Sequence, residues 1–131
     1  MGLSLAQAQA LAVDYTAAWN SRSAGAVAAF FAPDGSIIIN RGAPWAGRAG
    51  VAAMADGFYA DVPDLSLICD GIRLLGDHMV YLWTFTGHHS GTKNALTIRG
   101  CEEWDLDAEG QIVLSRGWFD AGDYARQVAG G

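Results

Sequence analysis

The sequence predicts an α+β domain in which three N-terminal helices pack on a curved, mostly antiparallel sheet, leaving a hydrophobic pocket between the two layers. Apolar residues at helical spacing dominate the first half of the chain, and alternating β-branched and aromatic residues dominate the part after Pro63. The length of 131 residues fits one domain, covering residues 1–131. A bent sheet over helices encloses a cone-shaped space, which is a usual place for a small-molecule site.

The first helix begins after Ser4, because Ser4 and Gln7 form a capping-box pattern, and no Gly or Pro interrupts the run to Asn20. Its apolar face consists of Leu11, Tyr15, Ala18 and Trp19.

Ser23 is expected to cap a short second helix, with Val27, Phe30 and Phe31 as its buried stripe. The segment 32–35 reads Ala-Pro-Asp-Gly and predicts a turn before a short strand at 37–39. A loop at 41–47 follows and contains Trp45. A third helix is then predicted from the apolar residues Val51, Met54, Ala55 and Phe58.

The second half predicts four strands, at 65–75, 78–89, 94–106 and 111–119. Gly71 indicates a bulge in the first of them. Turns are expected at 76–77 and 107–110, and a brief helix from about Ala121 ends the domain.

Composition narrows the classes of partner. With 8 basic and 14 acidic residues, the formal net charge is −6, which argues against nucleic acid or an anionic membrane surface. The sequence shows no signal-peptide pattern and no apolar run of membrane-spanning length, so we expect a cytoplasmic protein. Cys69 and Cys101 lack metal-site spacing and are expected to be free thiols, and no metal site is predicted.

Several local phrases resemble one known family. They are Tyr-Thr-Ala-Ala-Trp-Asn at 15–20, Phe-Phe-Ala-Pro-Asp-Gly at 30–35, Trp-Ala-Gly-Arg-Ala-Gly-Val at 45–51 and Gly-Trp-Phe-Asp at 117–120. In these phrases and in its order of elements the chain is similar to the SnoaL-like branch of the NTF2-like superfamily, which includes polyketide cyclases and ketosteroid isomerase. The resemblance implies the cone-shaped fold, no cofactor, and a homodimer built through the outer face of the sheet.

The named activities of that superfamily match this chain incompletely. Tyr15 and Glu102 match a tyrosine and an acidic residue of ketosteroid isomerase, but its general base would fall near Ile39 or Asn40, which cannot remove a proton from carbon. Limonene epoxide hydrolase has an Arg-x-Asp where this chain has residues 83–85, and an aspartate near Gly117. Both activities are therefore set aside. Asp120 matches an aspartate of the SnoaL-like branch, which implies an acid/base role.

Glu102 is the most informative position. It belongs to an otherwise apolar alternating set on the strand 94–106, so its carboxyl is expected to face the core, where its pKa would rise. A neutral or weakly acidic carboxyl suits general acid/base chemistry. The alternative is a bulge that turns Glu103 inward, or an ion pair of Glu102 with Arg99 or Arg116.

Three other residues complete the predicted catalytic set. Asp120 would act as a general acid/base or, alternatively, cap the last helix. Alternation puts His89 on the same face as Tyr81, Trp83 and Phe85, where it would polarise the substrate, unless it lies at a solvated strand end. Tyr15 would orient the substrate or simply pack in the core.

An aromatic lining for a flat apolar ligand is predicted from Trp19, Phe58, Trp83, Trp104 and Phe119, with Trp45 as a lid. The resulting hypothesis is a small cofactor-independent enzyme that performs cyclisation, isomerisation or dehydration on an apolar carbonyl compound. The alternatives are a non-catalytic ligand-binding or dimerisation module and, more remotely, a protein-interaction domain on the same fold.

Overall fold

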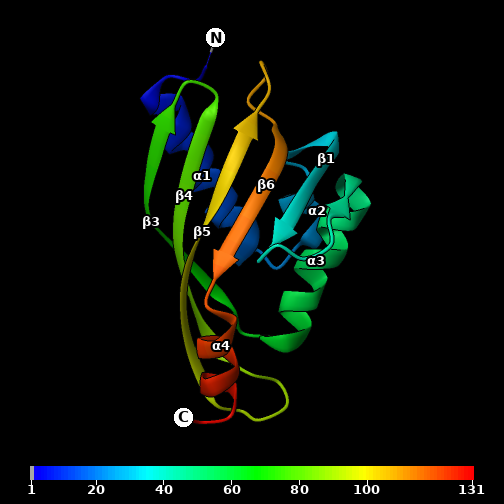
Figure 1. The fold of residues 1–131 in the computed structure, drawn as a ribbon, viewed down its shortest axis with the longest axis vertical. Coiled ribbons are helices and arrows are strands. Elements are labelled where there is room, and N and C mark those ends of the chain that lie inside the picture. The colour runs from blue at the N-terminus through cyan, green and yellow to red at the C-terminus, as the bar shows by residue number, and fades with distance from the viewer. Residues whose placement is uncertain (1) are drawn as a thin grey trace.

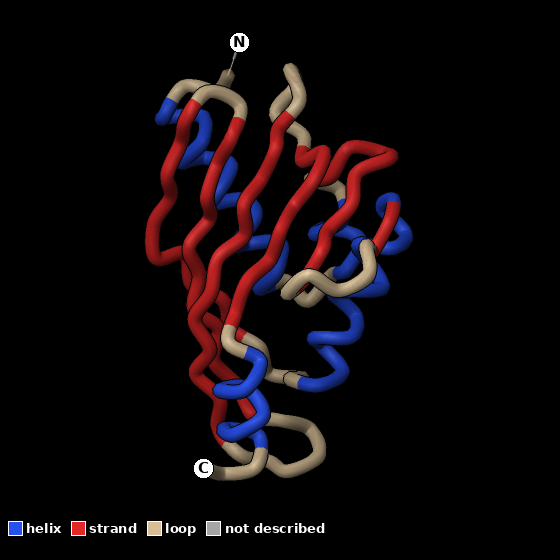
Figure 2. Tube along the Cα trace, in the orientation of Figure 1, coloured by secondary structure: helices blue, strands red, loops and turns tan. Residues whose placement is uncertain are grey.

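The computed structural model describes residues 2–131 and shows helices packed against one six-stranded sheet (Figure 1). Helices α1 (Leu5–Asn20) and α2 (Ala24–Ala28) lie behind the sheet in this view, and α3 (Gly47–Asp61) lies at its side next to β1. Helix α4 (Ala121–Val128) follows the last strand at one end of the domain (Figure 2). The predicted α+β class, with helices packed on a curved and mostly antiparallel sheet, is confirmed.

The strands are β1 (Phe31–Ile39), β2 (Trp45–Ala46), β3 (Ser66–Leu75), β4 (His78–His88), β5 (Ala95–Leu106) and β6 (Ile112–Phe119). Their order in the sheet is β2-β1-β6-β5-β4-β3. β1 and β6 pair in parallel, and the other neighbouring pairs are antiparallel. This order places β5 and β6 at the centre of the sheet, where side chains of the inner face meet α1.

Local signals in the sequence account for the ends of most elements. Ser4 and Gln7 form the predicted capping box at the start of α1. Gly76 has a φ of 61° in the β3–β4 turn, a backbone conformation that glycine adopts without strain. The predicted irregularity in β3 is present, because the register shifts between Cys69 and Gly71 and leaves Asp70 without a partner in the ladder.

The segment 31–39 differs from the prediction. Phe31 was expected in the second helix and 32–35 as a turn, but β1 begins at Phe31 and runs through both. The register of β1 against β6 shifts between Phe31 and Ser36, so the Pro-Asp-Gly residues form an irregular stretch inside the strand. Pairing with the central strand β6 outweighs the local turn preference of these residues.

The strand β5 has a strict inward and outward alternation. Its inward residues are Leu96, Ile98, Gly100, Glu102, Trp104 and Leu106. The register with β4 is regular from Ala95 to Asp105, so no bulge reverses the side chains around Glu102. Glu103 accordingly points to the outer face, where its carboxylate accepts a hydrogen bond from Trp118 Nε1 at 2.6 Å.

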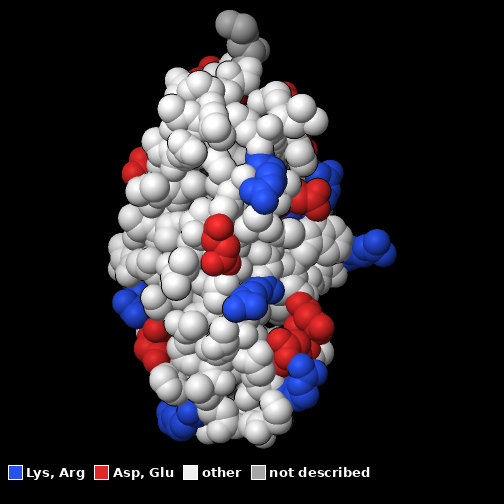
Figure 3. All heavy atoms as spheres, turned by 90° about the vertical axis from the view of Figure 1, so that its left-hand side faces the viewer, with Lys and Arg blue, Asp and Glu red and all other residues white. Residues whose placement is uncertain are grey.

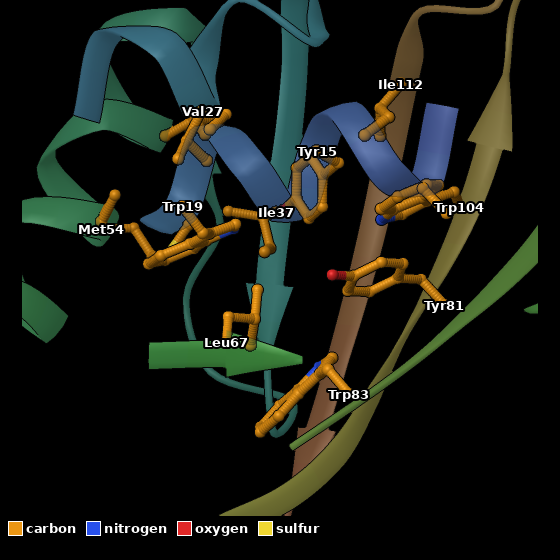
Figure 4. Packing of buried hydrophobic residues seen from close by; sticks show 14 of the residues in the cluster. Tyr15, Trp19, Val27, Ile37, Met54, Leu67, Tyr81, Trp83, Trp104 and Ile112 are labelled. Atoms are coloured by element: carbon orange, nitrogen blue, oxygen red, sulfur yellow. The ribbon is translucent and has the colours of Figure 1, made fainter. Parts of the chain in front are cut away.

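The core between helices and sheet is rich in aromatic rings (Figure 4). Tyr15 of α1 packs edge-on against Tyr81 and Trp104, and the Tyr81 and Trp104 rings are stacked with centroids 5.1 Å apart. Gly100 makes room for Trp83 on the neighbouring strand, because a Cβ at Gly100 would come within 2.5 Å of the Trp83 ring. The aromatic layer thus depends on a glycine in the middle of β5.

Candidate functional site

A buried carboxyl group lies at the centre of the molecule. Glu102 projects from the inner face of β5, is 6% exposed, and lines the cavity between sheet and helices. Its neighbours across the sheet are Tyr81 on β4 and Gly117 on β6. Since Gly117 carries no side chain, the space beside the Glu102 carboxyl on that strand stays open.

Three side chains hold this carboxyl from three different elements. Tyr15 of α1 donates its hydroxyl to Oε1 at 3.0 Å and to Oε2 at 2.9 Å. Trp104 Nε1 donates to Oε1 at 2.9 Å, and the Ser115 hydroxyl donates to Oε1 at 2.8 Å. Oε1 therefore receives all three donors, whereas Oε2 receives only the shared Tyr15 hydroxyl.

The carboxyl has no cationic partner within residues 2–131, since none of the ion pairs found there includes Glu102. Burial therefore raises the pKa of Glu102 above its ordinary value of 4.5, and the hydrogen bonds from Trp104, Ser115 and Tyr15 offset part of that rise. Burial, together with the charge of Glu102, also raises the pKa of Tyr15 well above 10.0, so Tyr15 stays a donor at neutral pH. A buried carboxyl with a raised pKa in a cavity wall is a candidate functional group.

The cavity beside Glu102 is narrow and almost entirely apolar. Its volume is about 50 Å³. Glu102 is the one ionisable residue in its wall, which is otherwise formed by Trp19, Ile37, Ile39, Met54, Phe58, Leu65, Leu67, Trp83, Phe85, Gly117, Trp118 and Phe119. Trp19, Phe58, Trp83 and Phe119 were predicted for this wall from the sequence, and the structure brings these four together here.

The C-terminal end of α1 is anchored to the edge strand β3, which places Trp19 in the cavity wall. Asn20 donates from Nδ2 to the Leu67 carbonyl at 2.9 Å and accepts from the Leu67 N–H at 2.7 Å. The Tyr59 hydroxyl of α3 donates to the Trp19 carbonyl at 2.8 Å. These bonds hold the Trp19 indole against the rings of Phe58 and Tyr59.

Asp120 does not reach the cavity. Its side chain is exposed at the start of α4 and accepts a hydrogen bond from the Asp123 N–H at 2.9 Å, so it caps that helix. The sequence analysis gave a helix cap as the alternative role of Asp120, and this is the position that the structure shows. The strand β6 ends at Phe119, one residue before Asp120.

His89 is also outside the cavity. β4 ends at His88, so the alternation that was expected to place His89 beside Phe85 stops one residue earlier. The His89 ring accepts hydrogen bonds at Nδ1 from the backbone N–H groups of Gly91 and Thr92, at 3.1 and 3.3 Å. These bonds tie His89 to its own turn.

Trp45 and Trp104 are not among the residues that line the cavity beside Glu102. Trp45 lies in β2, is 42% exposed, and borders a depression with Ile39, Gly42, Ala43 and Pro44. Ile39 also lines the cavity beside Glu102, whereas Trp45 does not. Trp104 is fully buried behind Glu102, where its indole N–H binds the carboxyl and does not line the cavity.

Ser115 is the member of the cluster that the sequence analysis missed. It is fully buried, and it faces Trp104 across the β5–β6 pair. The signal was available, because a serine among the apolar residues of a central strand needs a hydrogen-bond partner when it is buried. The sequence alone did not show that this partner is the carboxyl of Glu102.

The remaining polar side chains are dispersed. On the face at the β3 edge, acidic and basic side chains are interspersed (Figure 3). Within residues 2–131, no three His, Cys, Asp or Glu side chains come together as metal ligands would, and no helix is long and apolar enough to cross a membrane.

Comparison with models of known protein families identifies the family of this chain. The model of the SnoaL-like domain matches residues 12–115. A search of the curated proteins finds no significant match.

Several solved structures share the fold. A protein with a ketosteroid isomerase-like fold from Catenulispora acidiphila DSM 44928, determined in complex with trimethylamine, has a TM-score of 0.82 at 19% identity, covering 89% of this chain and 90% of that one. The putative hydroxylase AclR from Streptomyces galilaeus has a TM-score of 0.81 at 20% identity, covering 98% and 99%. A putative SnoaL-like polyketide cyclase from Jannaschia sp. CCS1 has a TM-score of 0.77 at 15% identity, covering 92% of both chains.

Proposed function

The chain belongs to the family of SnoaL-like domains, and we propose that it is a small cofactor-independent enzyme that performs acid/base chemistry on an apolar carbonyl compound. The observation that carries this proposal is the single buried carboxyl of Glu102 in the wall of an otherwise apolar cavity. Tyr15, Trp104 and Ser115 are positioning residues that hold this carboxyl.

Because the cavity wall contains a single ionisable residue, we propose a reaction in which the substrate neither gains nor loses a proton overall. Isomerisation, cyclisation and dehydration each take a proton from one atom of the substrate and return a proton to another. A single carboxyl can perform both transfers in turn, first as base and then as acid. Asp120 and His89 lie outside the cavity, so the proposal assigns both transfers to Glu102.

We assign the transfers to Oε2. In the first step, the ionised carboxylate uses an Oε2 electron pair to remove a proton from the carbon next to the carbonyl, and the C–H electrons form an enolate. In the second step, Oε2 gives a proton to another atom of the substrate, which restores the carboxylate. In D₂O the proton held on Oε2 exchanges with solvent between the two steps, so deuterium is delivered. Oε1 is less basic because it accepts all three hydrogen bonds, whereas Oε2 accepts only that of Tyr15.

The cavity limits what part of a substrate reaches Glu102. Its volume of about 50 Å³ is well below the roughly 300–1,000 Å³ that is usual for ligand pockets. We therefore propose that the reacting end of the substrate enters the cavity and that any larger skeleton stays at its mouth. That a structural neighbour was determined with a molecule as small as trimethylamine supports a small occupant.

Deuterium exchange tests this proposal without knowledge of the full reaction. The protein is incubated in D₂O with small ketones such as cyclopentanone and 2-cyclohexenone, and loss of the α-proton signals is followed by NMR. We expect exchange above the buffer rate, and Glu102→Gln should lower the enzymatic rate by about 10²-fold or more. Glu103→Gln is the matched control, because Glu103 is the same residue type on the opposite face of β5.

A non-catalytic binding module is the second candidate, favoured by the absence of a second ionisable group in the cavity wall. It predicts ketone binding without exchange. Equal exchange in the wild type and in Glu102→Gln would contradict catalysis by this carboxyl and favour the binding module.

We also propose that the chain forms a homodimer through the outer face of the sheet. Supporting this, Ile68 and Leu75 of β3 are exposed apolar residues, at 55% and 81%. Sedimentation equilibrium tests the proposal, since Ile68→Asp should shift a dimer toward the monomer.

A further inference from the structure

A second hollow adjoins the cavity beside Glu102. It lies at the loop between β1 and β2, has a volume of about 360 Å³, and is lined by Ile39, Gly42, Ala43, Pro44 and Trp45. We call it the Trp45 depression. None of its five residues carries a charge. Trp45 is the one aromatic residue among the exposed large hydrophobic side chains of residues 2–131, and an exposed indole in an uncharged hollow suits a flat apolar group.

Ile39 joins the two hollows, because its side chain belongs to the wall of both. In the parallel β1–β6 ladder Ile39 is paired with Gly117, and Gly117 is also the neighbour of Glu102 on β5. A Cβ at Gly117 would lie 3.6 Å from Ile39 Cγ1, so the Ile39 side chain lies against the open space beside Gly117. A ligand that extends from Glu102 past Ile39 therefore enters the Trp45 depression.

Trp45 lies on the same face of the sheet as the cavity. In the β1–β2 ladder it is paired with Ile37, and paired residues of an antiparallel ladder project from the same face. Ile37 is buried and lines the cavity. The inner face of the sheet therefore continues from the cavity wall at Ile37 to the exposed ring of Trp45.

Hydrogen bonds fix the start of the loop that forms the depression. The Asn40 N–H donates to the Gly117 carbonyl at 2.9 Å, and Asn40 Oδ1 accepts from the Phe119 N–H at 3.0 Å. The Gly42 N–H donates to the Ile39 carbonyl at 2.8 Å. Asn40 has a φ of 50°, a left-handed conformation that asparagine adopts more readily than most residues. Because these bonds tie the loop to residues of β6 that line the cavity, the two hollows have a defined relative position.

We propose that the Trp45 depression is a second subsite, which binds a flat, apolar and uncharged ring of the same ligand whose carbonyl end lies beside Glu102. This inference rests on the proposed function and deepens it, because it names the substrate class as a ketone that carries an aromatic or polycyclic skeleton. The cavity alone, at about 50 Å³, is small for a ligand pocket, whereas the depression, at about 360 Å³, is within the usual size of roughly 300–1,000 Å³. Ile39 sets the width of the passage between them.

Two ketones with the same head group test the proposal. They are cyclopentanone and 3-(2-phenylethyl)cyclopentanone, in which a two-carbon link carries a phenyl ring. Binding is followed by ¹H–¹⁵N NMR of the indole N–H groups, with Trp45 assigned from Trp45→Phe. We expect the larger ketone to bind about tenfold more tightly and to shift the Trp45 resonance, which cyclopentanone leaves in place.

Substitution of Trp45 should affect only the larger ketone. Trp45→Ala should weaken its binding about tenfold and leave the affinity for cyclopentanone unchanged. Trp45→Phe keeps an aromatic face and should retain most of the affinity. Ile39→Ala removes the side chain between the hollows and should increase the preference for the larger ketone, and a decrease would contradict the position assigned to Ile39.

Val113→Ala is the matched control. Val113 is 42% exposed, as Trp45 is, but it lies on β6 outside both hollows, so its truncation should leave both affinities unchanged. The proposal is overturned if the larger ketone does not bind, if it binds no more tightly than cyclopentanone, if it binds without shifting the Trp45 resonance, or if Trp45→Ala weakens both ketones equally.

Failure of the proposed function gives a different result, because none of these readouts needs proton transfer. Absence of deuterium exchange together with a Trp45 shift by the larger ketone would reject the catalysis and keep the subsite. Exchange of cyclopentanone protons together with an unchanged Trp45 resonance would keep the catalysis and reject the subsite.

Discussion

The Tyr15 hydroxyl bridges the two carboxylate oxygens of Glu102, at 3.0 Å from Oε1 and 2.9 Å from Oε2. These residues are 87 positions apart in the chain, and their contact joins α1 to the centre of the sheet. The Tyr15 hydroxyl therefore has both a structural and a chemical role. It helps to fix α1 over β5, and it provides the one hydrogen bond to the oxygen that we propose transfers protons.

Glu102 should make the stability of the protein depend on pH. Because burial raises the pKa of Glu102 above 4.5, the folded protein binds this proton more tightly than the unfolded chain does. The free energy of unfolding of the wild type, relative to Glu102→Gln, should therefore fall as the pH rises from about 4.5 through the folded pKa. The fall should be about 1.4 kcal/mol for each unit by which the folded pKa exceeds the unfolded one.

Urea unfolding from about pH 4 to about pH 8 measures this difference. Glu103→Gln, measured in parallel, corrects for losing a carboxyl from β5. A difference between wild type and Glu102→Gln that stays constant over the series would show that the carboxyl is not desolvated in solution.

Removing the Tyr15 hydroxyl should make Glu102 a weaker acid. In Tyr15→Phe, Oε2 has no hydrogen-bond donor and Oε1 keeps only Trp104 and Ser115, so the Glu102 pKa should rise further. Loss of this buried bond should also lower the free energy of unfolding by about 1–3 kcal/mol. A ¹³C NMR titration of the carboxyl and urea unfolding give the two values.

Tyr81→Phe is the control for that experiment. The Tyr81 ring packs on the same aromatic cluster, but its hydroxyl bonds to Thr16 at 2.5 Å and not to Glu102. If Tyr15→Phe and Tyr81→Phe move the Glu102 titration equally, the effect comes from packing and the role assigned to the Tyr15 hydroxyl is wrong.

Asp120 should contribute to stability and not to proton transfer. Asp120→Ala removes the cap of α4 and should cost about 1 kcal/mol of unfolding free energy, whereas Asp120→Asn keeps a capping side chain and should cost less. Both variants should exchange ketone α-protons at the wild-type rate. A folded Asp120→Asn protein without exchange activity would return Asp120 to the candidate catalytic groups.

Gly117 should control access to Glu102. A Cβ at Gly117 would lie 3.6 Å from Ile39 Cγ1, which is ordinary van der Waals contact, so Gly117→Ala should fold with little loss of stability. The added methyl enters the narrow space beside Glu102 and should weaken cyclopentanone binding about tenfold. Titration by NMR and a thermal melt check both expectations.

Gly100→Ala provides the contrast. There the Cβ would come within 2.5 Å of the Trp83 ring and closer still to the Trp118 carbonyl oxygen, so the variant should lose about 1–3 kcal/mol of unfolding free energy. Equal stability losses in Gly117→Ala and Gly100→Ala would contradict the description of the open space beside Glu102.

Local periodicity determined much of this protein. The capping box of α1, the inward-facing set on β5 and the burial of the Glu102 side chain all follow from patterns spanning a few residues, because a helix or strand repeats its direction at a constant interval. These local patterns do not predict the secondary structure correctly where a segment pairs with a strand that is distant in the sequence. β1 runs through a segment whose residues favour a turn, because β6 lies alongside it.

Only the tertiary structure decided which side chains meet. The sequence placed Glu102, Asp120 and His89 in one predicted site, but β4 and β6 end before His89 and Asp120. The His89 side chain binds its own turn, and the Asp120 side chain caps α4. Conversely, Ser115 and Tyr15 reach Glu102 from separate elements. Periodicity specifies the face of an element on which a residue lies. The position of that residue relative to other elements depends on strand register and helix docking, which are set by packing across the whole core.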